Sequence, residues 1–255
     1  MLPDQIKKLI FPTVLLFLAL SILLNVFLYL QLRKYYTLLY AVELDPLGLS
    51  YFQDFSNQRK PDETLQTVVF FGDSRAVEWP APNMEGFWFI NRGIGNQTSA
   101  QIVNRVDEHI TPLQPDVVLL QFCVNDLKTI PLFPERRQQI IFNCESNLQN
   151  VVQELLNLDS IVVISTIFPT GQVPLARRLV WSDEINESIE VVNNFIRDLS
   201  ADRVLIFDAA SLLSDDKGRL KHEYSFDELH LNEQGYQVLN IEFIKLLEKI
   251  KQGSP

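Results

Sequence analysis

The chain is poor in the residues that define several protein classes. It has only two cysteines in 255 residues, which excludes a small scaffold held together by disulfides. Nine glycines and 13 prolines are too few for a collagen-like or linker-like chain. Lys and Arg number 22 against 32 Asp and Glu, and the net charge of −10 argues against a nucleic-acid partner. A chain of this length can bury a full hydrophobic core without metals or disulfides.

One long segment near the N-terminus lacks charge. No charged residue lies between Lys8 and Arg33, and the segment 9–32 has 24 residues, of which 19 are hydrophobic. As a helix it is about 36 Å long, enough to cross about 30 Å of bilayer hydrocarbon. No cleavage site with small residues follows it, as would be expected after a secretory signal peptide. The alternative is a buried core helix, but such helices seldom lack a polar face over this length.

The apolar segment divides the chain into three parts. We predict an N-terminal tail and transmembrane anchor over residues 1–32, a juxtamembrane linker over 33–63 and one folded domain over 64–255. The membrane is then a partner, and the chain is a single-pass membrane protein. Cations flank the anchor on both sides, and we expect the short N-terminus inside the cytoplasm and the folded domain outside it.

Apolar runs in the folded domain predict buried parallel strands. Each run is short and continuous, as in strands that are covered on both faces. Helical apolar spacing separates the runs, so the order of elements predicts one doubly wound α/β domain. The five predicted strands are Thr67–Phe71, Phe87–Ile90, Val117–Phe122, Ile161–Ile164 and Val204–Phe207.

Glycine and polar residues follow several of these strands. In parallel sheets, ligands bind beyond the carboxyl ends of the strands. Four segments occupy such positions or precede the last predicted helix, and we expect them to share one rim. They are Gly72-Asp73-Ser74, Asn91–Asn96, Cys123-Val124-Asn125-Asp126 and Asp227–His230.

Ser74, His230 and Asp227 are candidate catalytic residues at this rim. A serine hydroxyl is a weak nucleophile until a base accepts its proton, and the base needs an orienting partner. Asp227 and His230 are three residues apart, so in a helical turn the carboxylate could hold the Nδ1–H of His230. Backbone N–H groups of Ser74 and of the 93–96 loop, with the Asn125 amide, could bind an oxyanion. Each motif alone is also an ordinary turn or helix entry, so only their combination points to catalysis.

The combination resembles the sequence blocks of SGNH/GDSL hydrolases over about residues 68–247. It is similar to the branch that contains acetylhydrolases and lysophospholipase-like esterases. The resemblance implies a flavodoxin-like α/β/α fold and ester hydrolysis through an acyl-enzyme, with Ser74 as nucleophile, His230 as base and Asp227 as its orienter. The blocks are Phe71-Gly72-Asp73-Ser74, Asn91-Arg92-Gly93-Ile94-Gly95, Val124-Asn125-Asp126 and Asp227-Glu228-Leu229-His230-Leu231-Asn232.

The resemblance also implies an oxyanion hole formed by the backbone N–H groups of Ser74 and Asn96 and the side chain of Asn125. Two positions depart from the family pattern. The glycine of the second block aligns with Asn96, which keeps its N–H and tolerates left-handed backbone better than most residues. The glycine two residues before Asn125 is replaced by Cys123, a larger side chain beside the expected hole.

Other site chemistries fit the sequence less well. The Gly-x-Ser-x-Gly elbow of α/β-hydrolases needs a glycine where this chain has Ala76. The pair Gly93 and Gly95 lacks the third glycine of a dinucleotide fingerprint. Three scattered histidines and two distant cysteines give no metal-ligand spacing. We therefore expect neither a metal nor a cofactor.

Two further residues are candidates for binding substrate. Arg75 follows Ser74 directly, and it either favours an anionic group of the substrate or caps the start of a helix. Trp181 lies in a long loop, residues 171–182, which either walls the substrate site or is solvated and anchored by this tryptophan.

The cysteines and the remaining histidines have simpler interpretations. Cys144 lies on the apolar stripe of a predicted helix, and we expect Cys123 and Cys144 to be buried and unpaired. A disulfide between them is the alternative if the domain is exported. His109 is expected to act as a helix-end cation, and His222 is expected to be a solvated loop residue.

These observations predict a membrane-anchored serine esterase that acts on an acyl or acetyl ester of a lipid or a glycan. Two alternatives remain. An acyl or acetyl transferase that modifies a glycan or lipid alcohol would use the same three residues, because water and an alcohol attack the same acyl-enzyme. A catalytically inactive, membrane-tethered binding module is the other alternative, suggested by Asn96 and Cys123 at glycine positions.

Overall fold

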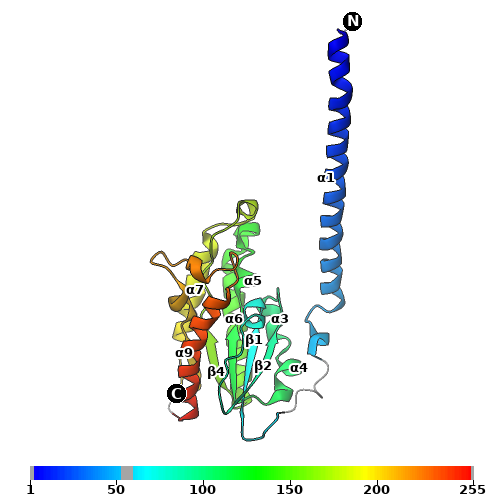
Figure 1. Ribbon diagram of the computed structural model, residues 1–255. Coiled ribbons are helices and arrows are strands. Elements are labelled where there is room, and N and C mark those ends of the chain that lie inside the picture. The colour runs from blue at the N-terminus through cyan, green and yellow to red at the C-terminus, as the bar shows by residue number, and fades with distance from the viewer. Residues whose placement is uncertain (1–2, 53–59, 254–255) are drawn as a thin grey trace. The chain divides into compact units, whose positions relative to one another are not determined.

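The computed structural model describes residues 3–52 and 60–253 (Figure 1). The chain forms two compact units, Met1–Pro46 and Leu47–Pro255. The second unit contains a five-stranded sheet in the order β2-β1-β3-β4-β5, in which every neighbouring pair is parallel. The strands are β1 (Gln66–Gly72), β2 (Phe87–Gly93), β3 (Val117–Gln121), β4 (Ile161–Ser165) and β5 (Val204–Phe207). The five predicted strands and the predicted α/β/α fold are confirmed.

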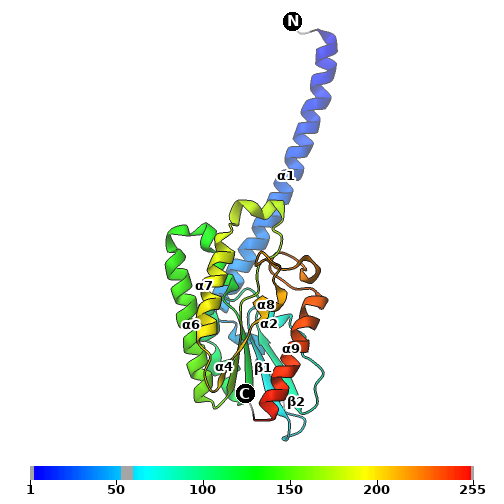
Figure 2. The same ribbon diagram turned by 90° about the vertical axis from the view of Figure 1, so that its left-hand side faces the viewer.

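Helices cover both faces of the sheet. Those of the second unit are α2 (Ser74–Val77), α3 (Ser99–Val103), α4 (Val106–His109), α5 (Val124–Leu127), α6 (Arg137–Asn157), α7 (Glu184–Asp198), α8 (Ala209–Leu213) and α9 (Glu233–Lys251). Successive strand residues point to opposite faces, so Val69 and Phe71 join the buried cluster beneath α6 and α7. Val68 and Phe70 join the cluster beneath α9. Figure 2 shows α6 and α7 on one side of the sheet and α9 on the other.

Helix α1 (Asp4–Leu44) makes up most of the first unit. Its segment Ile10–Leu44 is long and apolar enough to cross a membrane. The side chains of this segment are almost all exposed, whereas a core helix buries its apolar face. The helix continues past Leu32, where the predicted anchor ends. It stops before Asp45-Pro46, because a proline disfavours helical backbone at the residue before it.

Residues 47–52, which the sequence analysis assigns to the linker, belong to the second unit. The Gln97 side chain donates a hydrogen bond to the carbonyl of Leu47 at 2.7 Å. The ring of Phe52 packs edge-on against His109 at 5.1 Å between centroids. His109 is 0% exposed and lies in the last turn of α4, where it is a buried packing residue. Residues 53–59 of the predicted linker lie outside the described residues.

Cys123 and Cys144 form a disulfide, so the prediction of two unpaired cysteines is wrong. Cys144 is 0% exposed on α6, as its place on the apolar stripe predicts. Cys123 lies in the turn between β3 and α5 with a φ of 90°, a left-handed conformation that favours glycine. The sequence could not reveal the pairing, because it depends on how α6 packs against this turn.

The disulfide and the backbone at Cys123 can be separated by two double variants. We expect the stability order wild type, then Cys123→Gly/Cys144→Ala, then Cys123→Ala/Cys144→Ala. Loss of the disulfide should cost about 2–4 kcal/mol, and alanine at φ 90° about 1 kcal/mol more than glycine. Urea unfolding of the full-length chain in detergent, followed by tryptophan fluorescence, measures both steps. Equal midpoints for the two double variants would contradict the strained backbone at position 123.

Candidate active site

The loop after β1 presents Ser74 at the carboxyl edge of the sheet. Gly72 ends the strand, and any side chain there would collide with the carbonyl oxygen of Gln121 in β3. Asp73 then caps α2, since its carboxylate accepts the backbone N–H of Arg75 at 2.9 Å. Ser74 is the first residue of α2 and is partly exposed, so its hydroxyl can meet a substrate.

A hydrogen-bonded chain connects Ser74, His230 and Asp227. Ser74 Oγ lies 3.0 Å from His230 Nε2, and His230 Nδ1 lies 2.9 Å from Asp227 Oδ2. The backbone N–H groups of Leu229 and His230 also donate to Asp227 Oδ1, at 2.7 and 2.8 Å. Burial raises the pKa of Asp227, but the hydrogen bonds from the His230 ring and from these N–H groups outweigh it and hold the pKa below its ordinary value. The carboxylate is thereby kept ionised next to the imidazole.

Of the two asparagines of the expected oxyanion hole, Asn96 lies in the loop after β2 and Asn125 lies in α5, the short helix after β3. Asn96 has a φ of 62°, the left-handed backbone that asparagine tolerates, and its neighbour Gly95 lies beside Ser74. A Cβ at Gly95 would be 3.9 Å from the Cβ of Ser74. Asn125 is 3% exposed, and its Nδ2 donates to the carbonyl of Gln97 at 3.0 Å. The loop after β2 therefore lies beside Ser74, and Asn125 contacts that same loop through Gln97.

Arg75 is buried among carbonyl groups, whereas its predicted role in binding substrate requires an accessible side chain. It is 1% exposed and donates to the carbonyls of Phe168 and Leu229, both at 2.9 Å. Its guanidinium also lies over the ring of Phe168, 5.1 Å from the centroid. Arg75 thus connects the turn at Ser74 with the loop after β4 and with the segment that carries His230.

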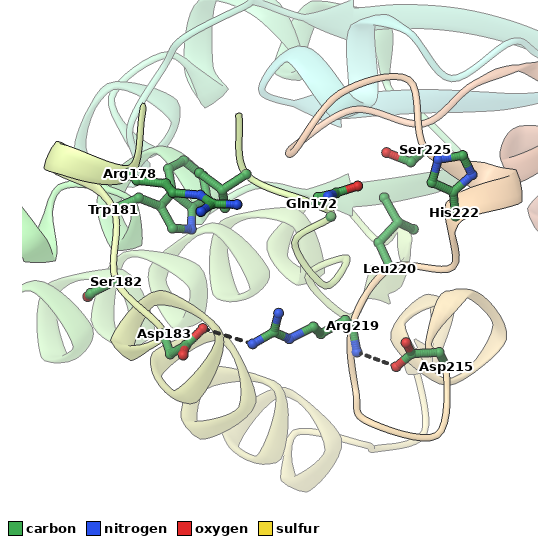
Figure 3. Close-up of a pocket in the computed structure, with 12 residues that line it drawn as sticks. Gln172, Arg178, Trp181, Ser182, Asp183, Asp215, Arg219, Leu220, His222 and Ser225 are labelled. Carbon is green, nitrogen blue, oxygen red and sulfur yellow. Dashed lines mark hydrogen bonds and ion pairs between the residues drawn. The ribbon is translucent and has the colours of Figure 1, made fainter. Parts of the chain in front are cut away.

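Trp181 lines a cavity of about 680 Å³ beside this segment. Figure 3 shows Trp181 and Arg178 on one side of the cavity and His222 and Ser225 on the opposite side. Ser225 Oγ donates to the carbonyl of Asp227 at 2.7 Å, so the cavity adjoins the loop of the hydrogen-bonded chain. His222 is exposed, as expected of a solvated loop residue. The cavity lining also includes Gln172, Asp183, Asp215 and Arg219.

Three residues near the site make contacts that were not predicted from the sequence. Lys128 Nζ donates to Asn125 Oδ1 at 2.5 Å. Arg177 forms an ion pair with Glu228, whose side chain is 3% exposed. Arg177 lies in a short helix, Leu175–Val180, inside the long loop after β4. The contact between Asn125 and Lys128 could have been predicted, because residues three apart lie on one face of a helical turn. The ion pair between Arg177 and Glu228 could not, because these residues are 51 positions apart in the sequence.

The fold and the site together define a class of protein. It has a parallel α/β/α sheet with a serine, a histidine and an aspartate hydrogen bonded at the carboxyl edge. Residues 70–238 match the GDSL-like Lipase/Acylhydrolase family, and the chain belongs to that family. It is therefore a hydrolase of the GDSL type. A comparison with curated protein sequences finds no match. Among residues 3–52 and 60–253, no group of three or more His, Cys, Asp or Glu side chains could hold a metal ion.

Solved structures share the fold at low sequence identity. A GDSL-like lipase from Bacteroides thetaiotaomicron is 17% identical with a TM-score of 0.62, over 79% of this chain and 99% of that chain. A lipase/acylhydrolase from Enterococcus faecalis is 18% identical with a TM-score of 0.52, over 72% and 95%. An acetylxylan esterase from Geobacillus stearothermophilus is 17% identical with a TM-score of 0.52, over 73% and 95%.

Asp73 should make the stability of the domain depend on pH. The residue is 0% exposed, and burial raises its pKa from 3.8 to about 6, although the neighbouring Arg75 opposes the shift. A raised carboxyl pKa means that the folded state binds the proton more tightly, so the contribution of Asp73 to stability is lost as pH rises from about 4 to 6. Relative to Asp73→Asn, which cannot ionise, the wild type should lose about 2 kcal/mol between pH 4 and pH 7. Urea unfolding at several pH values tests this, and a difference that stays constant with pH would contradict it.

Proposed function

We propose that the chain is a membrane-anchored serine esterase that hydrolyses a carboxylic ester through an acyl-enzyme. The observation that carries this proposal is the hydrogen-bonded chain from Ser74 through His230 to Asp227. It supplies the nucleophile, a base within 3.0 Å of the serine hydroxyl, and an ionised group that holds the base in place. Membership of the GDSL-like family supports the same chemistry.

Acylation follows from these positions. His230 Nε2 accepts the proton of Ser74 as Oγ attacks the ester carbonyl, and Asp227 stabilises the imidazolium that forms. The carbonyl oxygen becomes an oxyanion, for which the N–H groups of Ser74 and Asn96 and the Asn125 amide are the proposed donors. His230 then gives its proton to the departing alcohol oxygen, which leaves the acyl group on Ser74 Oγ.

Deacylation repeats the steps with water in place of serine. His230 takes a proton from water as the water oxygen attacks the acyl carbonyl. The same donors hold the second oxyanion, and collapse returns the proton to Ser74 Oγ and releases the acid. If an alcohol enters instead of water, the product is a new ester and the protein is a transferase.

One feature supports a membrane anchor, and a second supports a folded domain outside the cytoplasm. The first is the apolar stretch Ile10–Leu44 of α1, which is long enough to cross a bilayer. The second is the disulfide between Cys123 and Cys144, because disulfides persist in oxidising compartments and are rare in the cytosol. A reporter fused to the C-terminus measures the orientation directly.

The cavity beside the Asp227 loop supports a substrate with a polar alcohol part. Its lining combines an indole with amide, guanidinium, carboxylate and imidazole groups, which can bind hydroxyls while the indole packs on a C–H face. We therefore keep an acyl or acetyl ester of a glycan, or of a lipid with a polar head, as the substrate class. The same cavity is the observation that favours a transferase as second candidate, because it has room for an acceptor alcohol.

Active-site labelling tests the nucleophile. A fluorophosphonate probe should label the full-length wild-type chain, and Ser74→Ala should abolish both labelling and hydrolysis of p-nitrophenyl acetate. Ser211→Ala, which removes an exposed hydroxyl on α8, serves as the matched control and should behave as wild type. A folded wild-type chain that neither labels nor hydrolyses would favour the inactive binding module.

Product analysis with an added sugar separates the active alternatives, since free acid alone indicates a hydrolase and a sugar ester indicates a transferase.

Substitution of Asp227 tests the support of the base. Asp227→Asn keeps the shape of the side chain but cannot stabilise the imidazolium, so kcat should fall by about 10³- to 10⁴-fold with little change in KM. Steady-state kinetics on p-nitrophenyl esters give both constants. A loss of less than tenfold would mean that Asp227 does not act through His230.

A further inference from the structure

Lys128 contacts the side chain of Asn125 from the end of α5. It is the C-cap residue of that helix, three residues after Asn125, so both side chains lie on one face of the turn. Its Nζ donates to Asn125 Oδ1 at 2.5 Å. Hydrogen bonds from a charged donor are shorter and roughly twice as strong as neutral ones. The contact is therefore stronger than a hydrogen bond between two neutral groups.

Two neighbours fix the orientation of the Asn125 amide from opposite ends. The ammonium of Lys128 lies at its oxygen, and the carbonyl of Gln97 accepts from its nitrogen at 3.0 Å. A rotated amide would place its NH₂ against the ammonium and its oxygen against the carbonyl. Asn125 is 3% exposed, so water could not compensate the rotated form. One hydrogen of Nδ2 binds Gln97, and the fixed orientation leaves the second for a substrate oxygen.

We infer that Lys128 is a positioning residue that orients and polarises the Asn125 amide as an oxyanion donor. The inference rests on the proposed function, because an oxyanion forms only if Ser74 attacks an ester. A cation at the amide oxygen draws electron density from the nitrogen and makes its N–H groups better donors. The effect is strengthened by the low dielectric of a buried site. Lys128 is itself half-buried, and burial lowers its pKa while the nearby carboxylate of Asp73 opposes that shift.

Lys128→Met in the full-length chain removes the charge and keeps the length of the side chain. Loss of a whole oxyanion donor costs about 10²- to 10³-fold in kcat, so weakening one should lower kcat by about tenfold or more and leave KM within about threefold. Lys128→Arg, which restores a cation, should recover most of the loss. The matched control is Lys217→Met, which removes an exposed lysine and should leave both constants unchanged. A kcat within about twofold of wild type for Lys128→Met would overturn the inference, as would a loss that the arginine variant does not recover.

A double-mutant cycle asks whether Lys128 acts through Asn125. If it does, Lys128→Met should have almost no further effect on kcat once Asn125→Ala has removed the donor. An equal loss of kcat in both backgrounds would mean that Lys128 acts elsewhere, and would overturn the inference.

The contact can also be measured without a substrate. The Asn125 side-chain amide resonance, identified by its absence in Asn125→Ala, should move in Lys128→Met and stay in place in Lys217→Met when the ¹⁵N-labelled full-length chain is studied in detergent. If the wild type lacks Ser74-dependent hydrolysis, the proposed function fails, and this spectrum still decides the contact. An unchanged resonance in Lys128→Met would overturn the role of Lys128 whether or not the chain is an esterase.

Discussion

The position of β1 between β2 and β3 is the constraint on which the site depends. Parallel pairing on both sides of β1 brings three carboxyl ends together, so the segments that carry Ser74, Asn96 and Asn125 meet at one edge. His230 lies 156 residues after Ser74 and completes the arrangement from the segment before α9. Gly72 allows the close approach of β1 and β3, since a side chain there would meet the Gln121 carbonyl. The strand order thus brings Ser74, Asn96 and Asn125 to one edge, and the segment before α9 adds His230.

Buried arginines hold the loops at this edge. Carbonyl groups at the ends of strands and in the loops beyond them need partners when they are buried. Arg105 donates to the carbonyls of Gly72 in β1 and Arg92 in β2, at 2.8 and 2.7 Å. Arg75 does the same for two carbonyls in the loops after β4 and before α9. The rigid, multiply donating guanidinium suits this role. These side chains are therefore structural, although they bind carbonyl groups within two residues of Ser74 and His230.

The sequence predicts most of what depends on local pattern and little of what depends on packing. Continuous apolar runs predicted all five strands, and the order of the motifs predicted that Ser74, His230 and Asp227 lie close together. The disulfide was missed because Cys144 looks like any small residue on an apolar helical stripe. Arg75 was misassigned because its chain position beside Ser74 does not tell which way its side chain points. The first helix is also longer than the predicted anchor, because it continues through residues 33–44, which were assigned to the juxtamembrane segment.

Formation of an acyl-enzyme on Ser74 is the central claim, and peptide mass spectrometry tests it most directly. The full-length chain is mixed with p-nitrophenyl acetate, quenched with acid during turnover, digested and analysed. The account predicts the mass of one acetyl group on Ser74 itself, in an amount that rises and decays with turnover. Continued release of acetate with no acyl group on Ser74, or with acetyl groups on lysines alone, would contradict the account.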